Sequence, residues 1–443
     1  MRLINDKYLT DRFFYLFGGV ILLFVVSFPF NFIFPIAQAV LVLTIGFVIV
    51  DFLFLRKNNT QLTAERILPK VFSLSDKNKV IINIKSLSDR KLKLLVIDEL
   101  PVEFQKRDFH KELTMHPGEE LTIDYRLRPV VRGEYHFGAV NIFVSTNIGL
   151  WQRRLQFGKD QSIPVFPSII QMKDFELKAF NRVTSIKGLK KLRRLGHSYE
   201  FEQINNYVKG DDYRSINWKA TGRRGTLMVN QYQDERSQQV YCIIDKSRMM
   251  KMPFDDLSLV DYAVNATLAI SNIVLKKNDK AGLITFSDKL GVSIKAAYSS
   301  KQLNKILMAL YNEEERHLEA NYELLYHAAR KLITGRSLIL LFTNFESMFA
   351  LDRVLPILRR INILHLLVVI FFENTEIEDF LHKDTKTLKG IYTKTVARQF
   401  ATEKHQMAQK LKQFGIQSII TRPEDLSMNT INKYLELKAR GLI

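Results

Sequence analysis

Two groups of residues in this chain have side chains that could do chemistry. The first lies in the segment 210–221, which reads Gly-Asp-Asp-Tyr-Arg-Ser-Ile-Asn-Trp-Lys-Ala-Thr. Paired carboxylates such as Asp211 and Asp212 could work as acid and base or bind a cation. Adjacent side chains of an extended chain point in different directions, so the pair does not converge, and the sequence nearby holds no histidine. We therefore expect partner recognition, or a salt-bridged network, in preference to catalysis; the candidate residues are Gly210, Asp211, Asp212, Arg214, Trp218 and Lys219.

The second group follows two apolar runs. Asp245 and Ser247 come after the run 240–244, and Thr343 and Asn344 come after the run 337–342. Carboxylate and hydroxyl oxygens are ligands that a hard cation such as Mg²⁺ accepts. These four residues are therefore the candidates for a metal site.

Alternating strand and helix patterns position that second group. Between residues 239 and 443, strand-like runs near 240–244, 281–286, 337–342, 363–372 and 416–420 alternate with helical spacing near 260–275, 301–311, 321–333, 391–414 and 424–439. A further run at 290–294 could pair with 281–286 as a hairpin. The pattern predicts an α/β doubly wound, mostly parallel sheet, which binds ligands at the carboxyl ends of its strands. No glycine-rich phosphate loop follows any strand, so we expect no nucleotide site.

The preceding residues divide into a β-rich segment and a linker. Residues 58–167 alternate with period two between turn signals, which predicts a β-sandwich of immunoglobulin-like architecture. Residues 168–238 are interpreted as a linker that contains the 210–221 segment. A basic stretch at 187–196 in this linker could lie on lipid headgroups or on an acidic partner, or could be a solvated linker.

The N-terminal 57 residues predict a transmembrane helical hairpin. Two apolar runs, 13–30 and 32–55, each approach the ~20 residues that cross a bilayer. Lys and Arg flank both outer ends and are absent from the turn, so the positive-inside rule places both termini and the soluble domains in the cytoplasm of a multi-pass membrane protein. Asp51 is expected at the membrane interface. A signal peptide is rejected because the cleavage-like Ala37-Gln38-Ala39 lies inside apolar sequence.

Charge and cysteine content agree with a membrane-bound protein that faces a reducing compartment. The formal net charge is +19, which suits an anionic membrane surface. The sequence contains no zinc-ligand pairs and no RNA-binding signature, so we expect no nucleic acid partner. The single cysteine, Cys242, lies in an apolar run and is expected to be buried and inert.

The chain resembles the DUF58 family of bacterial proteins over nearly its full length. The resemblance rests on Arg132 to Gly138, Gly149-Leu150-Trp151, Tyr199-Glu200-Phe201, the 210–221 segment and Asp245-x-Ser247. It implies an N-terminal transmembrane pair, a C-terminal von Willebrand factor A-like domain and an association with MoxR-type AAA+ ATPases.

Domains of that type often carry a metal-ion-dependent adhesion site, with the pattern Asp-x-Ser-x-Ser and a later threonine and aspartate. Asp245 and Ser247 match the pattern, but Met249 stands at the second serine position. The loop 319–321 lacks the threonine, and Asn344, next to Thr343, stands where the later aspartate is expected. Asp255 or Asp256 could compensate for the lost charge. The resemblance therefore implies a degenerate Mg²⁺ site of low occupancy, and no other cofactor.

The leading hypothesis is a non-enzymatic, membrane-anchored cytoplasmic adaptor. It would bind protein partners through the von Willebrand factor A-like domain and the 210–221 segment, with an AAA+ ATPase supplying energy for assembly or maturation of protein complexes. One alternative is a metal-dependent hydrolase that uses Asp211, Asp212 or Asp245. The other is a binder of anionic lipid surfaces, whose binding should weaken steeply with salt.

Overall fold

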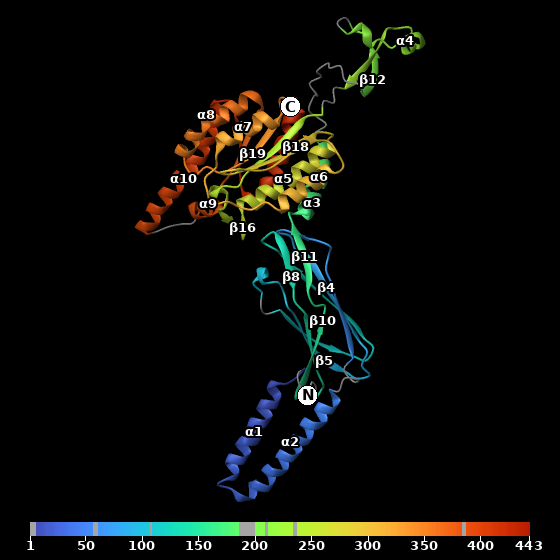
Figure 1. Ribbon diagram of the computed structural model, residues 1–443, viewed down its shortest axis with the longest axis vertical. Coiled ribbons are helices and arrows are strands. Elements are labelled where there is room, and N and C mark those ends of the chain that lie inside the picture. Colours follow the sequence, from blue (N-terminus) through green and yellow to red (C-terminus); the bar gives the residue numbers. More distant parts are fainter. Residues whose placement is uncertain are drawn as a thin grey trace. The chain divides into compact units, whose positions relative to one another are not determined.

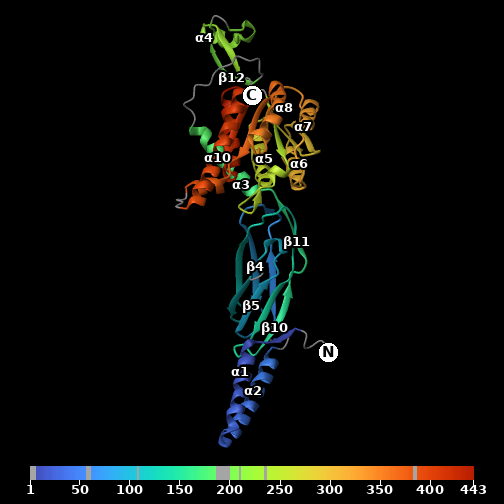
Figure 2. The same ribbon diagram turned by 90° about the vertical axis from the view of Figure 1, so that its left-hand side faces the viewer.

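The computed structural model describes residues 6–55, 61–106, 109–185, 200–208, 211–233, 237–382 and 387–443. The chain separates into two compact units, Met1–Phe166 and Pro167–Ile443. The predicted basic stretch 187–196 and Gly210 lie outside the described residues. Figures 1 and 2 show the elements of both units from two sides.

The first unit begins with two apolar helices that lie side by side (Figures 1 and 2), α1 (Asp11–Ser27) and α2 (Phe34–Phe54), joined through the short helix η1 (Asn31–Ile33). Among the described residues, α2 is the one helix that is long and apolar enough to cross a membrane, with a mean hydropathy of 2.4. The 17 residues of α1 span about 26 Å, less than the ~30 Å of a hydrocarbon core. Of the two spans expected from the sequence, one is therefore supported.

Three small sheets follow. One has the order β1-β10-β9-β5-β6, the second β2-β4-β7 and the third β3-β11-β8. Buried side chains from the first two sheets form one core, including Ile82 on β4 and Ile142 on β9. The predicted β-sandwich is thus present. Its strands are β1 (Lys7–Leu9), β2 (Leu62–Ile67), β3 (Phe72–Ser73), β4 (Asn78–Ser86), β5 (Leu92–Asp98), β6 (His110–Met115), β7 (Glu120–Leu127), β8 (Gly133–Phe137), β9 (Val140–Ser145), β10 (Trp151–Phe157) and β11 (Gln161–Phe166).

The boundary between the helices and the sandwich differs from the expected one. Residues 7–9, which the sequence assigns to the membrane hairpin, form strand β1 and pair with β10. Asp51, expected at the membrane interface, is fully buried at the end of α2. Its carboxylate accepts hydrogen bonds from the Thr146 hydroxyl and from the backbone N–H groups of Leu150, at 2.8 Å, and Trp151, at 2.9 Å. The carboxylate thus fastens α2 to the β9–β10 turn.

The second unit contains a six-stranded sheet with the order β18-β17-β14-β19-β20-β21. All neighbouring pairs are parallel except β17 with β18, which is the hairpin expected from the sequence. Helices cover both faces. Side chains of α3, α5, α6 and α11 share one core with the sheet, and those of α7, α8 and α10 share the other. The predicted doubly wound α/β arrangement is therefore present, with strands β14 (Gln239–Asp245), β17 (Lys280–Phe286), β18 (Leu290–Ala297), β19 (Leu338–Phe342), β20 (Leu366–Phe372) and β21 (Gln417–Thr421).

The helices of this unit show where the sequence pattern was insufficient. Helix α8 (Met348–Leu364) was not predicted, and its last residues were read as part of the strand that begins at Leu366. Buried apolar runs look alike in helices and strands, which explains the error. The other helices are α5 (Leu259–Lys276), α6 (Gln302–Tyr311), α7 (Tyr322–Leu332), α9 (Thr375–His382), α10 (Leu388–Gln413) and α11 (Leu426–Ala439).

The segment 168–238, interpreted as a linker, contains folded elements. Its first part is helix α3 (Ile169–Ser185), whose Met172, with Ile169 and Phe175, packs in the core beside α5. Its second part is a hairpin of β12 (Glu200–Asn206) and β13 (Met228–Gln233), with η4 (Tyr213–Ser215) and α4 (Trp218–Arg224) between the strands. The 210–221 segment therefore forms the connection inside a hairpin.

Candidate functional site

Asp245 ends the central strand β14, between Phe286 of β17 and the end of β19. The residue is 1% exposed. One carboxylate oxygen accepts the N–H of Ser247 at 2.9 Å, and the other accepts the Thr343 hydroxyl at 2.8 Å. The structure therefore brings together three of the four predicted metal-site residues, but through direct contacts among themselves.

Tyr322, at the first residue of α7, completes this cluster and was not identified from the sequence. Its hydroxyl lies 2.7 Å from the Thr343 hydroxyl and 3.4 Å from an oxygen of Asp245. Burial raises the pKa of Asp245, and the hydrogen bonds from its neighbours offset only part of that effect. Burial and the nearby carboxylate both raise the pKa of Tyr322 well above its usual range.

The fourth candidate, Asn344, faces a lysine. Its side-chain oxygen accepts a hydrogen bond from the ammonium of Lys404 on α10 at 2.8 Å, and the same ammonium donates to the carbonyl of Phe345. Burial lowers the pKa of Lys404 from 10.5 to about 8. The cation beside Asn344 is thus supplied by the chain itself.

These residues do not fit a divalent cation. Mg²⁺ requires near-octahedral oxygen ligation and usually keeps several waters. Here both oxygens of the single carboxylate already accept hydrogen bonds, and Tyr322, which is 7% exposed, packs against them. Within the described ranges, no group of three or more His, Cys, Asp or Glu residues could hold a metal ion. The hydroxyl of Ser247 is buried without a hydrogen-bond partner. It could supply one neutral ligand, which is too few for a divalent cation.

A buried ion pair lies beside Asp245. The ammonium of Lys246 pairs with the carboxylate of Glu313, which also accepts the Thr285 hydroxyl at 2.7 Å. The backbone N–H of Arg316 donates to the carbonyl of Lys246, and that of Arg248 to Leu318. These bonds hold the loop 313–319 against the end of β14 and make the strand ends a rigid platform.

Exposed side chains gather on this platform. Phe349, in the first turn of α8, is 83% exposed, and Leu318 is 57% exposed. Glu319 pairs with Arg353 at 3.0 Å and lies 3.9 Å from Arg248, which links α8, the loop and the end of β14. We call Arg248, Leu318, Glu319, Phe349 and Arg353 the strand-end surface.

The acidic residues of the 210–221 segment hold local backbone. Asp211 accepts the N–H of Val208 at 2.9 Å, and Asp212 caps η4 by accepting the N–H of Arg214 at 3.0 Å. Asn217 caps α4 by accepting the N–H of Ala220, and its amide donates to Asn230 on β13. Asp212 therefore acts as a helix cap, Asp211 closes a local turn, and the two carboxylates bind different backbone groups.

The aromatic and cationic residues of the same segment point outward. Trp218 is 71% exposed and Tyr213 is 68% exposed. Arg214 and Lys219 are exposed as well, and the Arg214 guanidinium lies 5.7 Å from the ring of Tyr213. The exposed side chains of this connection are thus mainly aromatic and cationic, with Asp212 as an exposed acidic residue among them.

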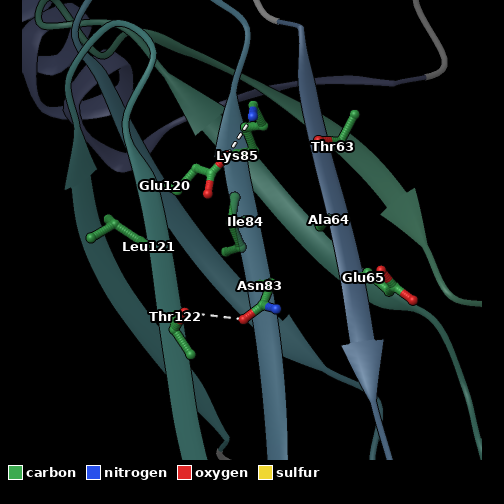
Figure 3. Close-up of a pocket in the computed structure, with 9 residues that line it drawn as sticks. All are labelled: Thr63, Ala64, Glu65, Asn83, Ile84, Lys85, Glu120, Leu121 and Thr122. Atoms are coloured by element: carbon green, nitrogen blue, oxygen red, sulfur yellow. Dashed lines mark hydrogen bonds and ion pairs between the residues drawn. The ribbon is translucent and has the colours of Figure 1, made fainter.

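A shallow groove on the sandwich is shown in Figure 3. It lies over β2, β4 and β7, where the Thr122 hydroxyl donates to Asn83 at 3.0 Å and Lys85 pairs with Glu120. These are cross-strand pairs on an open sheet face. The polar side chains that line the groove are all exposed, so we interpret the groove as the solvated side of the sheet.

Residues 203–377 match DUF58, described as a protein of unknown function. The matched segment is less than half of the chain. This match begins inside β12 and extends through β20 to the start of α9. The uncharacterized protein YeaD of Bacillus subtilis (strain 168) is 26% identical over 172 residues, which are 39% of this chain and 41% of YeaD. The alignment thus spans less than half of either protein.

Solved structures show weaker likenesses. The conserved hypothetical protein BatB of Bacteroides thetaiotaomicron is 12% identical, covering 46% of this chain and 99% of BatB, with a TM-score of 0.29. The CARDB domain of the Pyrococcus furiosus PF1109 protein is 15% identical, covering 25% of this chain and 96% of that domain, with a TM-score of 0.18. Both TM-scores lie below 0.5, so these likenesses carry no argument for function.

Proposed function

We propose that this DUF58-domain chain is a membrane-anchored adaptor that binds protein partners on its cytoplasmic side. In this proposal the α/β unit is a von Willebrand factor A-like domain without a metal. The partner that supplies energy is a MoxR-type AAA+ ATPase, as the resemblance implies, and the adaptor contributes to assembly or maturation of other protein complexes.

The membrane part of the proposal rests on α2 and on its partner helix. α2 has the length and hydropathy of a span, and α1 lies beside it with an apolar sequence that begins at Phe13. We propose that α1 forms a second, shorter pass, so that both soluble units stay on the cytoplasmic side with the flanking Lys and Arg residues. A bilayer can thin locally around a short helix at modest cost.

The docking part of the proposal is carried by one observation, the exposure of Phe349. A large aromatic side chain that is 83% exposed at the start of α8 lies at the edge where doubly wound sheets bind ligands. Exposed aromatic and arginine side chains on a rigid support are typical of protein-binding surfaces. The rigid loop 313–319 and the Glu319 ion pairs provide that support.

The hydrolase alternative receives no support from the site. Asp211 and Asp212 cap local backbone, and Asp245 is buried under Tyr322. Asp245 lacks the open approach that a substrate and an attacking water need, and the carboxylates of Asp211 and Asp212 hydrogen-bond to two different backbone N–H groups.

The test is affinity purification of the full-length protein in mild detergent from its native cells, with and without ATP, followed by mass spectrometry. We expect nucleotide-sensitive recovery of an AAA+ ATPase, which Phe349→Ser should abolish. Ile363→Ser is the matched control, because Ile363 is 82% exposed on the same helix about 21 Å away. Equal losses with both variants, or no ATPase with the wild type, would refute the proposal.

A further inference from the structure

Helix α4 has three features on one side that its contacts within the described chain do not explain. At 100° per residue, Trp218, Gly222, Lys219 and Arg223 lie within about 140° of the helix circumference. The opposite side contains Thr221, whose hydroxyl accepts the N–H of Met228 and so faces the hairpin. We call the four residues the α4 face.

The first feature is the tryptophan. Trp218 is the first residue of α4 and is 71% exposed. Single exposed apolar residues are common, but an exposed tryptophan is the residue type most enriched among the side chains that dominate binding energy at protein interfaces. Burying it on a partner would gain more than burying any other side chain of this helix.

The second feature is the arrangement of charge. Lys219 lies in the first turn of α4, where the helix dipole disfavours a cation, and Arg223 lies four residues later on the same side. Within the described part of the chain, neither residue forms an ion pair. Arg223 and Arg224 in the last turn are favourable to the dipole, so Lys219 is the residue that the dipole does not explain. A carboxylate group placed between Lys219 and Arg223 would offset the unfavourable interaction of Lys219 with the helix dipole and the repulsion between the two cations.

The third feature is the glycine. Gly222 lies inside α4, where glycine costs roughly 0.8–1.0 kcal/mol relative to alanine. A Cβ atom added there would meet nothing within 4 Å. Gly225 differs, because it ends the helix with a φ of +71° that favours glycine. The described contacts therefore give no reason for the missing side chain at Gly222, which lies one helical turn after Trp218 on the same side of α4.

Together these features define a ligand. We propose that the α4 face binds an acidic, extended segment of a partner protein, whose backbone passes over Gly222. Its carboxylates pair with Lys219 and Arg223, and an apolar side chain packs on Trp218. This inference rests on the proposed adaptor function and names the chemistry of one partner.

A protein segment fits the α4 face better than an anionic membrane does. Helices that lie in a membrane interface insert a row of large apolar side chains, whereas the α4 face has one. The missing side chain at Gly222 lets a peptide backbone approach α4 closely. A layer of lipid headgroups does not need such a close approach.

The experiment uses the full-length protein in phosphatidylcholine nanodiscs and a fluorescein-labelled peptide of alternating glutamate and leucine. We expect saturable binding by anisotropy, and at least about tenfold weaker binding when glutamine replaces glutamate in the peptide. Trp218→Ala should weaken binding about thirtyfold, as for a central interface residue. Gly222→Ala should weaken it about tenfold, while the thermal stability of the protein stays equal or rises because alanine favours the helix.

The matched charge control is on the same helix. Arg223→Gln should weaken binding about tenfold, whereas Arg224→Gln, which removes the same charge outside the α4 face, should change it less than about twofold. Equal effects of the two substitutions would show binding by net charge and would overturn the inference. So would unchanged affinity in Gly222→Ala, or Trp218-dependent binding to phosphatidylserine vesicles without binding to the peptide.

These outcomes separate the two proposals. Loss of ATPase recovery in Phe349→Ser, together with peptide binding that ignores the α4 face, would leave the adaptor function in place and remove this inference. Peptide binding that depends on the α4 face, with no ATPase recovered from cells, would keep the inference and remove the proposed ATPase partner.

Discussion

Substitutions of Asp245 test whether its carboxylate stabilises the fold or binds a metal ion. In Asp245→Ala, the Ser247 N–H and the Thr343 hydroxyl lose their acceptor. Each buried donor left unpaired costs about 1–3 kcal/mol, but the Thr343 hydroxyl can turn to Tyr322 at 2.7 Å. One donor, the Ser247 N–H, is then left unpaired, and we therefore expect the opening free energy of β14 to fall by about 1–3 kcal/mol.

Asp245→Asn should behave differently. The amide oxygen can still accept the Ser247 N–H, and the amide N–H₂ can donate to the Thr343 hydroxyl while that hydroxyl donates to Tyr322. The cost of burying a charge disappears at the same time. We expect an opening free energy within about 1 kcal/mol of the wild type, or above it, at neutral pH.

The pH dependence of Asp245 has a definite sign. Burial raises the pKa of Asp245 above its usual value of 3.8, so between that value and the raised one the folded state binds more protons than the unfolded state. The stability contribution of this group is then complete below the usual pKa and is lost as the pH rises through the folded pKa. The advantage of Asp245→Asn over the wild type should grow over the same interval.

Hydrogen exchange with mass spectrometry on peptides from β14 measures these opening energies in the full-length protein. Neither tryptophan of the chain, Trp151 or Trp218, lies in this core, so fluorescence would not report it. Equal destabilisation by asparagine and alanine would show that the charge is required. Mg²⁺ protection of β14 in the wild type but not in Asp245→Asn would refute the metal-free site.

Three further predictions follow from single buried groups. Asp51→Ala should lower the free energy of opening of the 146–151 turn by about 3–9 kcal/mol, since three donors lose their acceptor. Hydrogen exchange measures this energy, and unchanged exchange would show that Asp51 does not fasten the turn. Burial raises the pKa of Cys242 to about 12. Iodoacetamide should therefore modify the thiol of the native protein more than about a thousandfold more slowly than the thiol of the urea-unfolded protein. Fast labelling of the native protein would contradict the burial of Cys242. The pKa of Lys404 is lowered by burial from 10.5 to about 8. Between these two pKa values the unfolded state binds more protons than the folded state, so the hydrogen-exchange protection of β19 should rise with pH in the wild type. In Lys404→Met the protection should not change with pH, and the same pH dependence in both proteins would contradict the lowered pKa.

Local patterns predicted the sheets well where neighbouring residues decide the structure. The alternation in 58–167 and the apolar runs of the α/β unit correspond to observed strands, because side-chain period and burial repeat along a strand. The pattern was insufficient at α8, where Pro356 and a buried apolar sequence hide a helix. It was also insufficient for α3, whose packing against α5 depends on residues about 90 positions away in the chain.

The candidate sites show the same division. The sequence named Asp245, Ser247, Thr343 and Asn344 as metal candidates, and Asp211, Asp212 and Trp218 among the partner-binding candidates. The structure shows that Asp211 and Asp212 each accept a local backbone N–H, and their role in partner binding stays a prediction. Tyr322 carried no signal, since a tyrosine at the start of an amphipathic helix is an ordinary core residue. Its role follows only from its position over Asp245.

The sequence by itself determined the apolar N-terminal helix, the β-sandwich, the alternating sheet and the DUF58 segment, because each is encoded in residues close together in the chain. Only the tertiary structure decided which polar groups are already paired. Asp245 meets Tyr322 and Thr343 across 77 and 98 positions of sequence, and Asp51 meets Leu150 across 99. Whether a buried carboxylate is free to bind a ligand or is already hydrogen-bonded within the fold depends on its neighbours, and those neighbours come from distant parts of the chain.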